Sequence, residues 1–138
     1  MTVRFLDTNI ILRHLLQDHP EQSRASTELL RRVEARDLRV RISDLVVFEA
    51  VFTLQRSYGV PPGEIRDHLL PLIELPAVDL PGKRLLRSAF DLYVDLKLPF
   101  ADAYHAALMT REHVTEIITF DRDFDRVPGA TRLEPGDV

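Results

Sequence analysis

Short apolar segments alternate with helical ones along the chain, and this alternation constrains the fold most. Strand-like runs such as Val3 to Leu6 and Leu38 to Ser43 are each followed by a stretch with helical spacing of apolar residues, such as Asn9 to Leu16. This order predicts an α/β domain with a central parallel sheet and helices on both faces, because parallel strands need helical crossovers. Further strands are expected at Val78, Glu116 to Phe120 and Thr131 to Leu133, and further helices at Pro20 to Arg36, Asp44 to Tyr58, Gly63 to Ile73, Lys83 to Leu96 and Phe100 to Arg111.

The composition predicts one domain, spanning residues 1–138. The chain has 138 residues, of which 45% are apolar and 29% charged, with no internal repeat and no dividing linker. It contains no cysteine, which excludes disulfides, thiolate zinc sites and cysteine nucleophiles and is compatible with a reducing compartment. The apolar runs are too short to span a bilayer. We therefore expect a cytoplasmic protein.

Two carboxylates interrupt segments that otherwise predict burial. Glu49 lies inside the apolar run Leu45 to Phe52, and Asp102 lies inside Leu98 to Tyr104. An ionised carboxylate removed from water without a partner costs several kcal/mol or more. Each is therefore expected to meet a cation, strong donors or a metal.

Two more acids, Asp7 and Asp121, end the clearest strand-like segments. In an open parallel sheet, sites form beyond the carboxyl ends of the strands. If Glu49 and Asp102 point the same way, the four acids meet in one cleft. Hard oxygen ligands favour Mg²⁺ or Mn²⁺, and one or two ions would bind.

Each acid also has a structural explanation. Asp7 and Asp121 precede helical stretches and are suited to capping them. Glu49 and Asp102 lie within helices, where a buried ion pair with an arginine is the alternative. His105 shares a helix face with Asp102, so a mixed carboxylate and imidazole site remains open. The small polar residues Thr8, Asn9 and Thr119 are suited either to orienting carboxylates or to turns and caps.

The net charge of −4 argues against binding nucleic acid through overall basicity. A group of arginines, most of them in the helical stretch Pro20 to Arg36, favours a solvated helix face over a phosphate-binding patch. The group comprises Arg24, Arg31, Arg32, Arg36, Arg39 and Arg41.

Four motifs in order resemble those of the PIN-domain nucleases, and more narrowly a VapC-type toxin of a type II toxin-antitoxin system. They are Phe5-Leu6-Asp7-Thr8-Asn9, Val47-Phe48-Glu49-Ala50, Ala101-Asp102-Ala103 and Ile118-Thr119-Phe120-Asp121-Arg122-Asp123-Phe124. The resemblance implies a three-layer PIN-like fold and Mg²⁺- or Mn²⁺-dependent cleavage of RNA.

Carried over by motif, Asp7, Glu49, Asp102 and Asp121 are the acidic site positions, and Asp7 and Asp102 are the firmest metal ligands. Asp123 lies close enough to Asp121 to leave the fourth acid open. A metal-activated water would attack phosphorus in line, oriented by Glu49 or Asp121. The resemblance also implies an inhibitory antitoxin as partner.

Apolar residues in Asp44 to Tyr58 and Gly63 to Ile73 exceed what one small core needs, so a homodimer is expected. Two other functions remain open. One is a PIN-like module that binds RNA or a protein without cutting. The other is a phosphotransferase that forms an aspartyl-phosphate, although Asp7-Thr8-Asn9 lacks the usual second aspartate two residues on.

Overall fold

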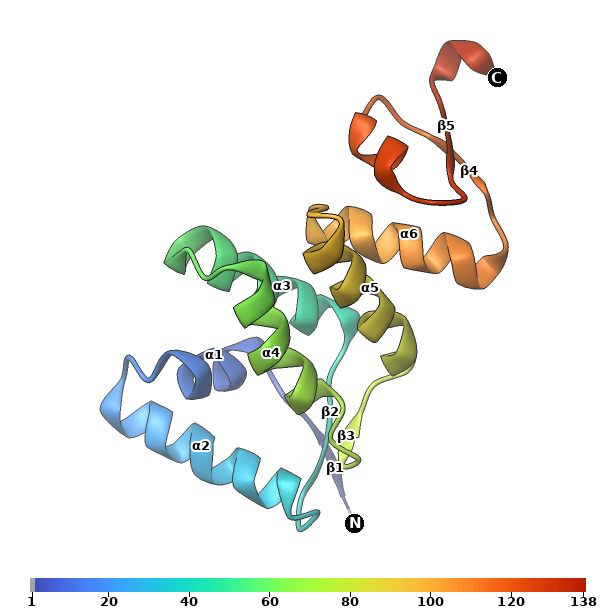
Figure 1. The fold of residues 1–138 in the computed structure, drawn as a ribbon. Helices are drawn as coiled ribbons and strands as arrows, with labels where there is room; N and C mark the ends of the chain where they lie inside the picture. Colours follow the sequence, from blue (N-terminus) through green and yellow to red (C-terminus); the bar gives the residue numbers. More distant parts are fainter. Residues whose placement is uncertain (1) are drawn as a thin grey trace. The chain divides into compact units, whose positions relative to one another are not determined.

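The computed structural model describes residues 2–138, in which short strands alternate with longer helices (Figure 1). The chain divides into two compact units, Met1–Lys83 and Arg84–Val138. None of the helices in residues 2–138 is long and apolar enough to cross a bilayer. The strands are β1 (Val3–Phe5), β2 (Arg39–Arg41), β3 (Val78–Asp79), β4 (Glu116–Ile118) and β5 (Thr131–Leu133). The helices are α1 (Thr8–Leu16), α2 (Pro20–Glu34), α3 (Asp44–Tyr58), α4 (Pro62–Ile73), α5 (Lys83–Asp95) and α6 (Phe100–Glu112), with 3-10 helices η1 (Arg122–Arg126) and η2 (Pro135–Asp137).

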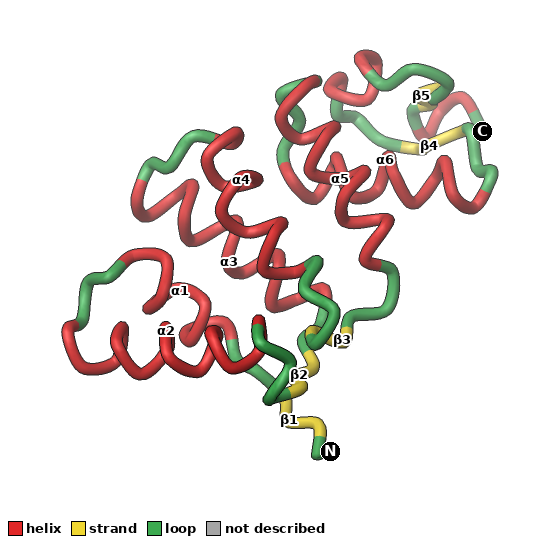
Figure 2. The backbone as a smooth tube through the Cα atoms, turned by 60° about the horizontal axis from the view of Figure 1, so that its bottom comes forward, coloured by secondary structure: helices red, strands yellow, loops and turns green. Residues whose placement is uncertain are grey.

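The N-terminal unit is built on a parallel sheet of three strands in the order β1-β2-β3. Helices α1 and α2 connect the first pair of strands, and α3 and α4 connect the second. Figure 2 shows the three strands as neighbouring yellow segments. With six α-helices in residues 2–138, this arrangement confirms the predicted α/β class with a parallel sheet, and it is consistent with a three-layer fold.

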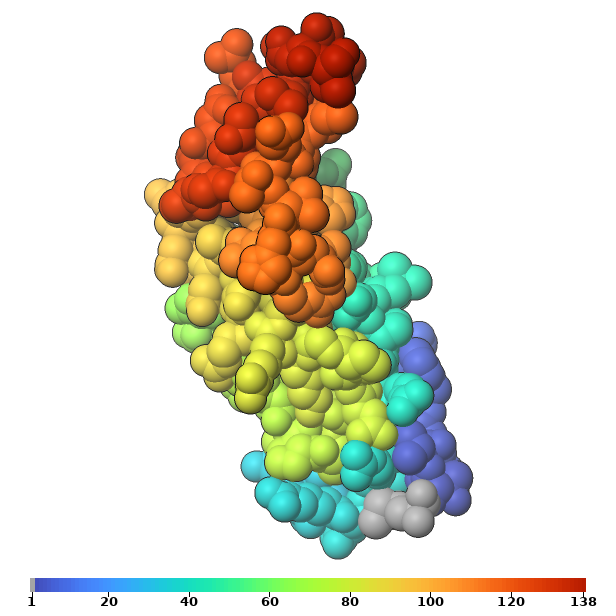
Figure 3. All heavy atoms as spheres, turned by 90° about the vertical axis from the view of Figure 1, so that its right-hand side faces the viewer, coloured from blue at the N-terminus to red at the C-terminus, as the bar shows by residue number. Residues whose placement is uncertain are grey.

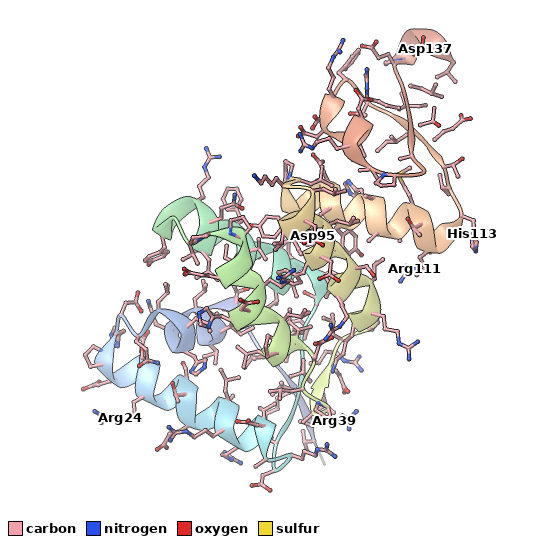
Figure 4. All side chains as sticks on the ribbon, in the orientation of Figure 1. Arg24, Arg39, Asp95, Arg111, His113 and Asp137 are labelled. Carbon is pink, nitrogen blue, oxygen red and sulfur yellow. The ribbon has the colours of Figure 1, made fainter. Side chains whose placement is uncertain are left out.

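Strand β2 is covered on one face only, as its alternation predicts. Val40 and Ile42 are buried, whereas Arg39 and Arg41 are exposed. Arg39, labelled in Figure 4, donates to Asp79 of the neighbouring strand at 2.6 Å. The ion pair therefore adds a side-chain link to the backbone ladder of β2 and β3.

Helix α3 has clear end signals and one buried side. The Ser43 hydroxyl accepts from the Val46 N–H at 3.4 Å, and Gly59 ends the helix with a φ of 63°, a left-handed value that glycine adopts without strain. One side packs into the core through residues such as Val47 and Ala50. The opposite side is exposed, so the burial expected for the whole run Leu45 to Phe52 is wrong for that side.

Helix α2 carries charges of both signs on its exposed side. Figure 4 shows the labelled Arg24 projecting away from the helix. This mixture fits the favoured interpretation of the arginine group as a solvated helix face. The exposed charged residues are Glu21, Arg24, Glu28, Arg31, Arg32 and Glu34.

The C-terminal unit contains an aromatic cluster and a second, two-stranded parallel sheet of β4 and β5. The Phe100 ring lies 4.7 Å from that of Phe90 and 5.4 Å from that of Tyr93, both edge-on. Burial raises the pKa of Tyr93 to about 12. In Figure 3 the orange and red atoms of β4, η1 and β5 form one packed mass.

Arg132 of β5 ties this second sheet to η1. Its side chain, 13% exposed, pairs with Asp125 at 3.1 Å. It also donates to the Thr119 carbonyl oxygen at 3.3 Å. Arg132 thereby contacts the chain at Thr119 and at Asp125, and the acids Asp121 and Asp123 lie between these two points.

Candidate metal-binding active site

Three carboxylates converge in the C-terminal unit. One oxygen from each of Asp102, Asp121 and Asp123 lies within 4.8 Å of the others. Asp102 stands in the first turn of α6, which follows Pro99, and Asp121 and Asp123 stand at the start of η1. Because α6 packs against η1, residues far apart in the sequence meet at one point.

Hydrogen bonds hold the η1 side of this cluster in place. The Asp121 N–H donates to the Thr119 hydroxyl at 3.0 Å, and an Asp121 carboxylate oxygen accepts from the Asp123 N–H at 2.9 Å. The capping role predicted for Asp121 is therefore confirmed. Asp123 pairs in addition with Arg126 at 3.2 Å. One carboxylate oxygen of Asp121 thus caps η1, and the same carboxylate belongs to the cluster.

The pKa values of Asp102 and Asp121 are shifted in opposite directions. Burial, followed by the negative charge of Asp121, raises the pKa of Asp102. The bond from the Asp123 N–H, the largest of several causes, lowers the pKa of Asp121. A side-chain hydrogen bond joins the pair. Without a cation, Asp102 is therefore the member that takes up the proton they share.

The donor set suits a hard divalent cation. All three groups are carboxylates, and neither thiolate nor His105 belongs to the cluster. Two oxygens on one Mg²⁺, each at about 2.1 Å, lie at most about 4.2 Å apart. Three ligand oxygens cannot all lie opposite one another, and neighbouring oxygens of an octahedral Mg²⁺ lie about 3.0 Å apart. The three carboxylate oxygens lie within 4.8 Å of one another, so inward rotation of the side chains would complete such a set. Asp102, Asp121 and Asp123 would hold such an ion.

The other two predicted site residues lie in the N-terminal unit. Asp7 follows β1 at the N-cap position of α1, but its side chain makes no capping bond. The capping explanation is therefore wrong for Asp7. Glu49 on α3 accepts a hydrogen bond from the Thr8 hydroxyl at 3.0 Å. This bond ties Glu49 to the residue that directly follows Asp7.

Glu49 is exposed, contrary to the burial expected from its apolar neighbours. Leu45 and Phe52, one turn before and one turn after it, are 64% and 63% exposed. Apolar residues lie on both sides of α3, and only one side packs. The alternative explanation, a buried ion pair of Glu49 with an arginine, is therefore wrong, and the carboxylate accepts the bond from Thr8 instead.

Comparison with known families gives one result. A family model described as PIN domain matches residues 4–130. The chain belongs to the PIN domain family. The match covers both compact units, which supports a nuclease that binds a divalent metal. A search of the curated proteins found no match.

The sequence of this PIN domain singled out residues that form hydrogen bonds or lie close together in the structure, but it did not indicate how they pair. Thr8 and Thr119 were candidates for orienting acids; Thr8 bonds Glu49 directly, and Thr119 holds the backbone of Asp121. Asp123 joins the cluster together with Asp121, so both candidates for the fourth acid are present. The partnership of Asp123 with Arg126 was missed, although their spacing of three residues in a short helix is a usable indication. The meeting of Asp7 and Glu49 with Asp102 and Asp121 stays a prediction.

Proposed function

We propose that this PIN domain is a Mg²⁺- or Mn²⁺-dependent endoribonuclease. The observation that carries the proposal is the convergence of Asp102, Asp121 and Asp123 on one point at which a cation fits. Family membership supports the nuclease class. RNA as substrate and the preferred metal follow from the sequence resemblance and from the all-oxygen donor set.

Four acids act on one phosphodiester in this proposal: Asp7, Glu49, Asp102 and Asp121. A bound cation would activate the attacking water and neutralise charge on the phosphate. Asp7 and Asp102 would supply ligand oxygens, and Asp102, whose pKa is raised, would have to be deprotonated to do so. Glu49, held by Thr8 through Oε2, would accept a proton from the attacking water as the water oxygen bonds to phosphorus. The P–O bond to the leaving ribose oxygen would break in the same displacement, and solvent would protonate that oxygen. Asp121 orients the same water or completes the ligand set.

The acidic cluster also bears on how the chain meets RNA. The net charge is −4, so without a cation the site repels a polyanion. A divalent ion therefore serves binding as well as chemistry. This links RNA affinity to metal concentration.

We further propose that the chain acts in the cytoplasm as the toxin of a toxin-antitoxin pair. The acidic site is complementary to an arginine or lysine offered by an inhibitory antitoxin. The exposed apolar side chains of Leu45 and Phe52 on α3 support a homodimer. Light scattering tests the dimer, and co-expression with the product of the adjacent gene tests inhibition.

The experiment for the nuclease proposal is an RNA cleavage assay with purified protein, in Mg²⁺ and in chelator. The expected result is cleavage by wild type in Mg²⁺ only, with Asp102→Asn inactive. Binding of RNA without cleavage in Mg²⁺ or Mn²⁺ would instead support the non-catalytic module. Transfer of a phosphoryl group to Asp7 would support the phosphotransferase.

A further inference from the structure

The residue directly before Asp121 is an aromatic side chain exposed to solvent. Phe120 is 74% exposed, more than Phe5 or Phe52. An exposed phenylalanine has lost the hydrophobic stabilisation that burial would give it. Its place beside the acidic cluster of Asp102, Asp121 and Asp123 invites a functional explanation.

The backbone around Phe120 is held firmly. Thr119 is bonded on three sides: its N–H donates to the Leu133 carbonyl at 2.9 Å, its carbonyl accepts from Arg132 at 3.3 Å, and its hydroxyl accepts from the Asp121 N–H at 3.0 Å. The ring is therefore presented on an ordered turn and not on a loose loop.

The neighbours of Phe120 suit a nucleotide. Ile118, two residues earlier, is 58% exposed and adds apolar surface. Arg122, two residues later, is exposed and adds a cation suited to a phosphate. Phe120 directly precedes Asp121, with Cα atoms about 3.8 Å apart, so its backbone lies beside the cluster.

We propose that Phe120 is a stacking platform for an unpaired base next to the scissile phosphate of the RNA. The proposal rests on the nuclease function above and deepens it. A chain of net charge −4 gains little from overall attraction to RNA, so contacts that do not depend on charge must supply affinity. Base stacking on an aromatic ring does this and tolerates different bases. It also favours single-stranded RNA, whose bases are free to stack.

Steady-state cleavage of a short single-stranded RNA tests the platform. Phe120→Leu keeps apolar bulk but removes the flat ring, and we expect KM to rise about tenfold with kcat within about twofold of wild type. Phe120→Tyr should restore KM. Tyr58→Leu, at an aromatic position 50% exposed and distant in sequence from the cluster of Asp102, Asp121 and Asp123, is the matched control and should leave KM unchanged.

A modified substrate makes the test specific. An abasic nucleotide beside the cleaved bond should raise KM for wild type by the same factor and add nothing for Phe120→Leu. If the abasic nucleotide raises KM of Phe120→Leu by the same factor as it raises KM of wild type, Phe120 does not contact that base. A large drop in melting temperature or a changed molecular mass for Phe120→Leu would assign the ring to packing or assembly instead and overturn the proposal.

A binding measurement keeps the proposal separate from catalysis. The chain has no tryptophan, so Phe120→Trp in an Asp102→Asn background gives a single reporter. We expect the oligonucleotide to quench the tryptophan fluorescence of Phe120→Trp. A fully abasic strand should not quench it, and the oligonucleotide should not quench the tryptophan of Tyr58→Trp. Quenching by a strand that wild type fails to cleave would refute the nuclease and retain the platform. Cleavage by wild type, with no quenching of the tryptophan fluorescence of Phe120→Trp and no change in KM for Phe120→Leu, would refute the platform and retain the nuclease.

Discussion

The hydrogen bond from Thr8 to Glu49 gives the sharpest prediction, because one substitution removes it without changing shape. Thr8 is 5% exposed, and its hydroxyl lies 3.0 Å from Glu49 Oε2. Thr8→Val keeps the branched side chain and deletes only the donor. Hydrogen bonds to charged groups contribute about 1.5–3 kcal/mol, but Glu49 is exposed and water can replace the lost donor. We therefore expect a loss of about 1 kcal/mol, which lowers the melting temperature by roughly 3–5 °C.

The effect on catalysis should be larger than the effect on stability. A partner that orients a reacting or ligating group typically contributes about 10–100-fold to activity. We expect kcat of Thr8→Val to fall by that factor, with KM little changed because Thr8 acts through its bond to Glu49 in this proposal. Thr27→Val is the matched control, since Thr27 bonds His14 at 2.8 Å in the same unit without contacting an acid. It should lose comparable stability and keep kcat.

A double-mutant cycle decides whether the bond matters through Glu49. Glu49→Gln alone should lower kcat strongly, and adding Thr8→Val should cost little more. Fully additive losses in log kcat would show that Thr8 does not act through Glu49. An unchanged kcat for Thr8→Val would refute the positioning role outright.

Three further predictions concern stability and metal binding. Asp102→Asn should abolish cleavage yet raise the melting temperature in chelator at pH 7. Because the pKa of Asp102 is raised in the folded protein, its ionised carboxylate destabilises the fold. The gain in melting temperature over wild type should therefore vanish as the pH falls through the raised pKa of Asp102. Burial, and to a smaller extent the charge of Arg31, lowers the pKa of His14 from 6.5. The stability that neutral His14 contributes is therefore present above pH 6.5 and is lost as the pH falls through the lowered pKa. Denaturant titrations at a series of pH values should show this loss for wild type and not for His14→Gln. Leu69→Ala, at a position 0% exposed, should lower the free energy of unfolding in urea by about 2–5 kcal/mol, and a loss below about 1 kcal/mol would contradict its place in the core.

The order of strands and helices was predictable because each element carries a local pattern. β2 alternates apolar and arginine residues, and α3 begins at Ser43 and ends at Gly59, which are strong start and stop residues. Differences at element ends are one or two residues, as in α2, which ends at Glu34 and not Arg36. Periodicity together with these start and stop residues specifies this level of structure.

Burial and pairing at the site were less predictable, because they depend on which surfaces meet. Glu49 was expected to be buried since α3 is apolar nearly all round, yet packing covers only one side of the helix. The bond between Thr8 and Glu49 joins residues 41 positions apart, and no local pattern encodes it. Asp121 and Asp123 both reach Asp102 because η1 packs against α6, a tertiary contact that the sequence does not specify locally.

The central claim is that Asp7 and Asp102 serve one metal-dependent reaction. Calorimetric titration with Mn²⁺, run beside RNA cleavage, tests it for wild type, Asp7→Asn and Asp102→Asn. The account predicts that each substitution weakens the same binding event and removes cleavage, and that Asp67→Asn, an exposed acid on α4, changes neither. Wild-type Mn²⁺ affinity and wild-type cleavage in the Asp7→Asn protein would contradict it.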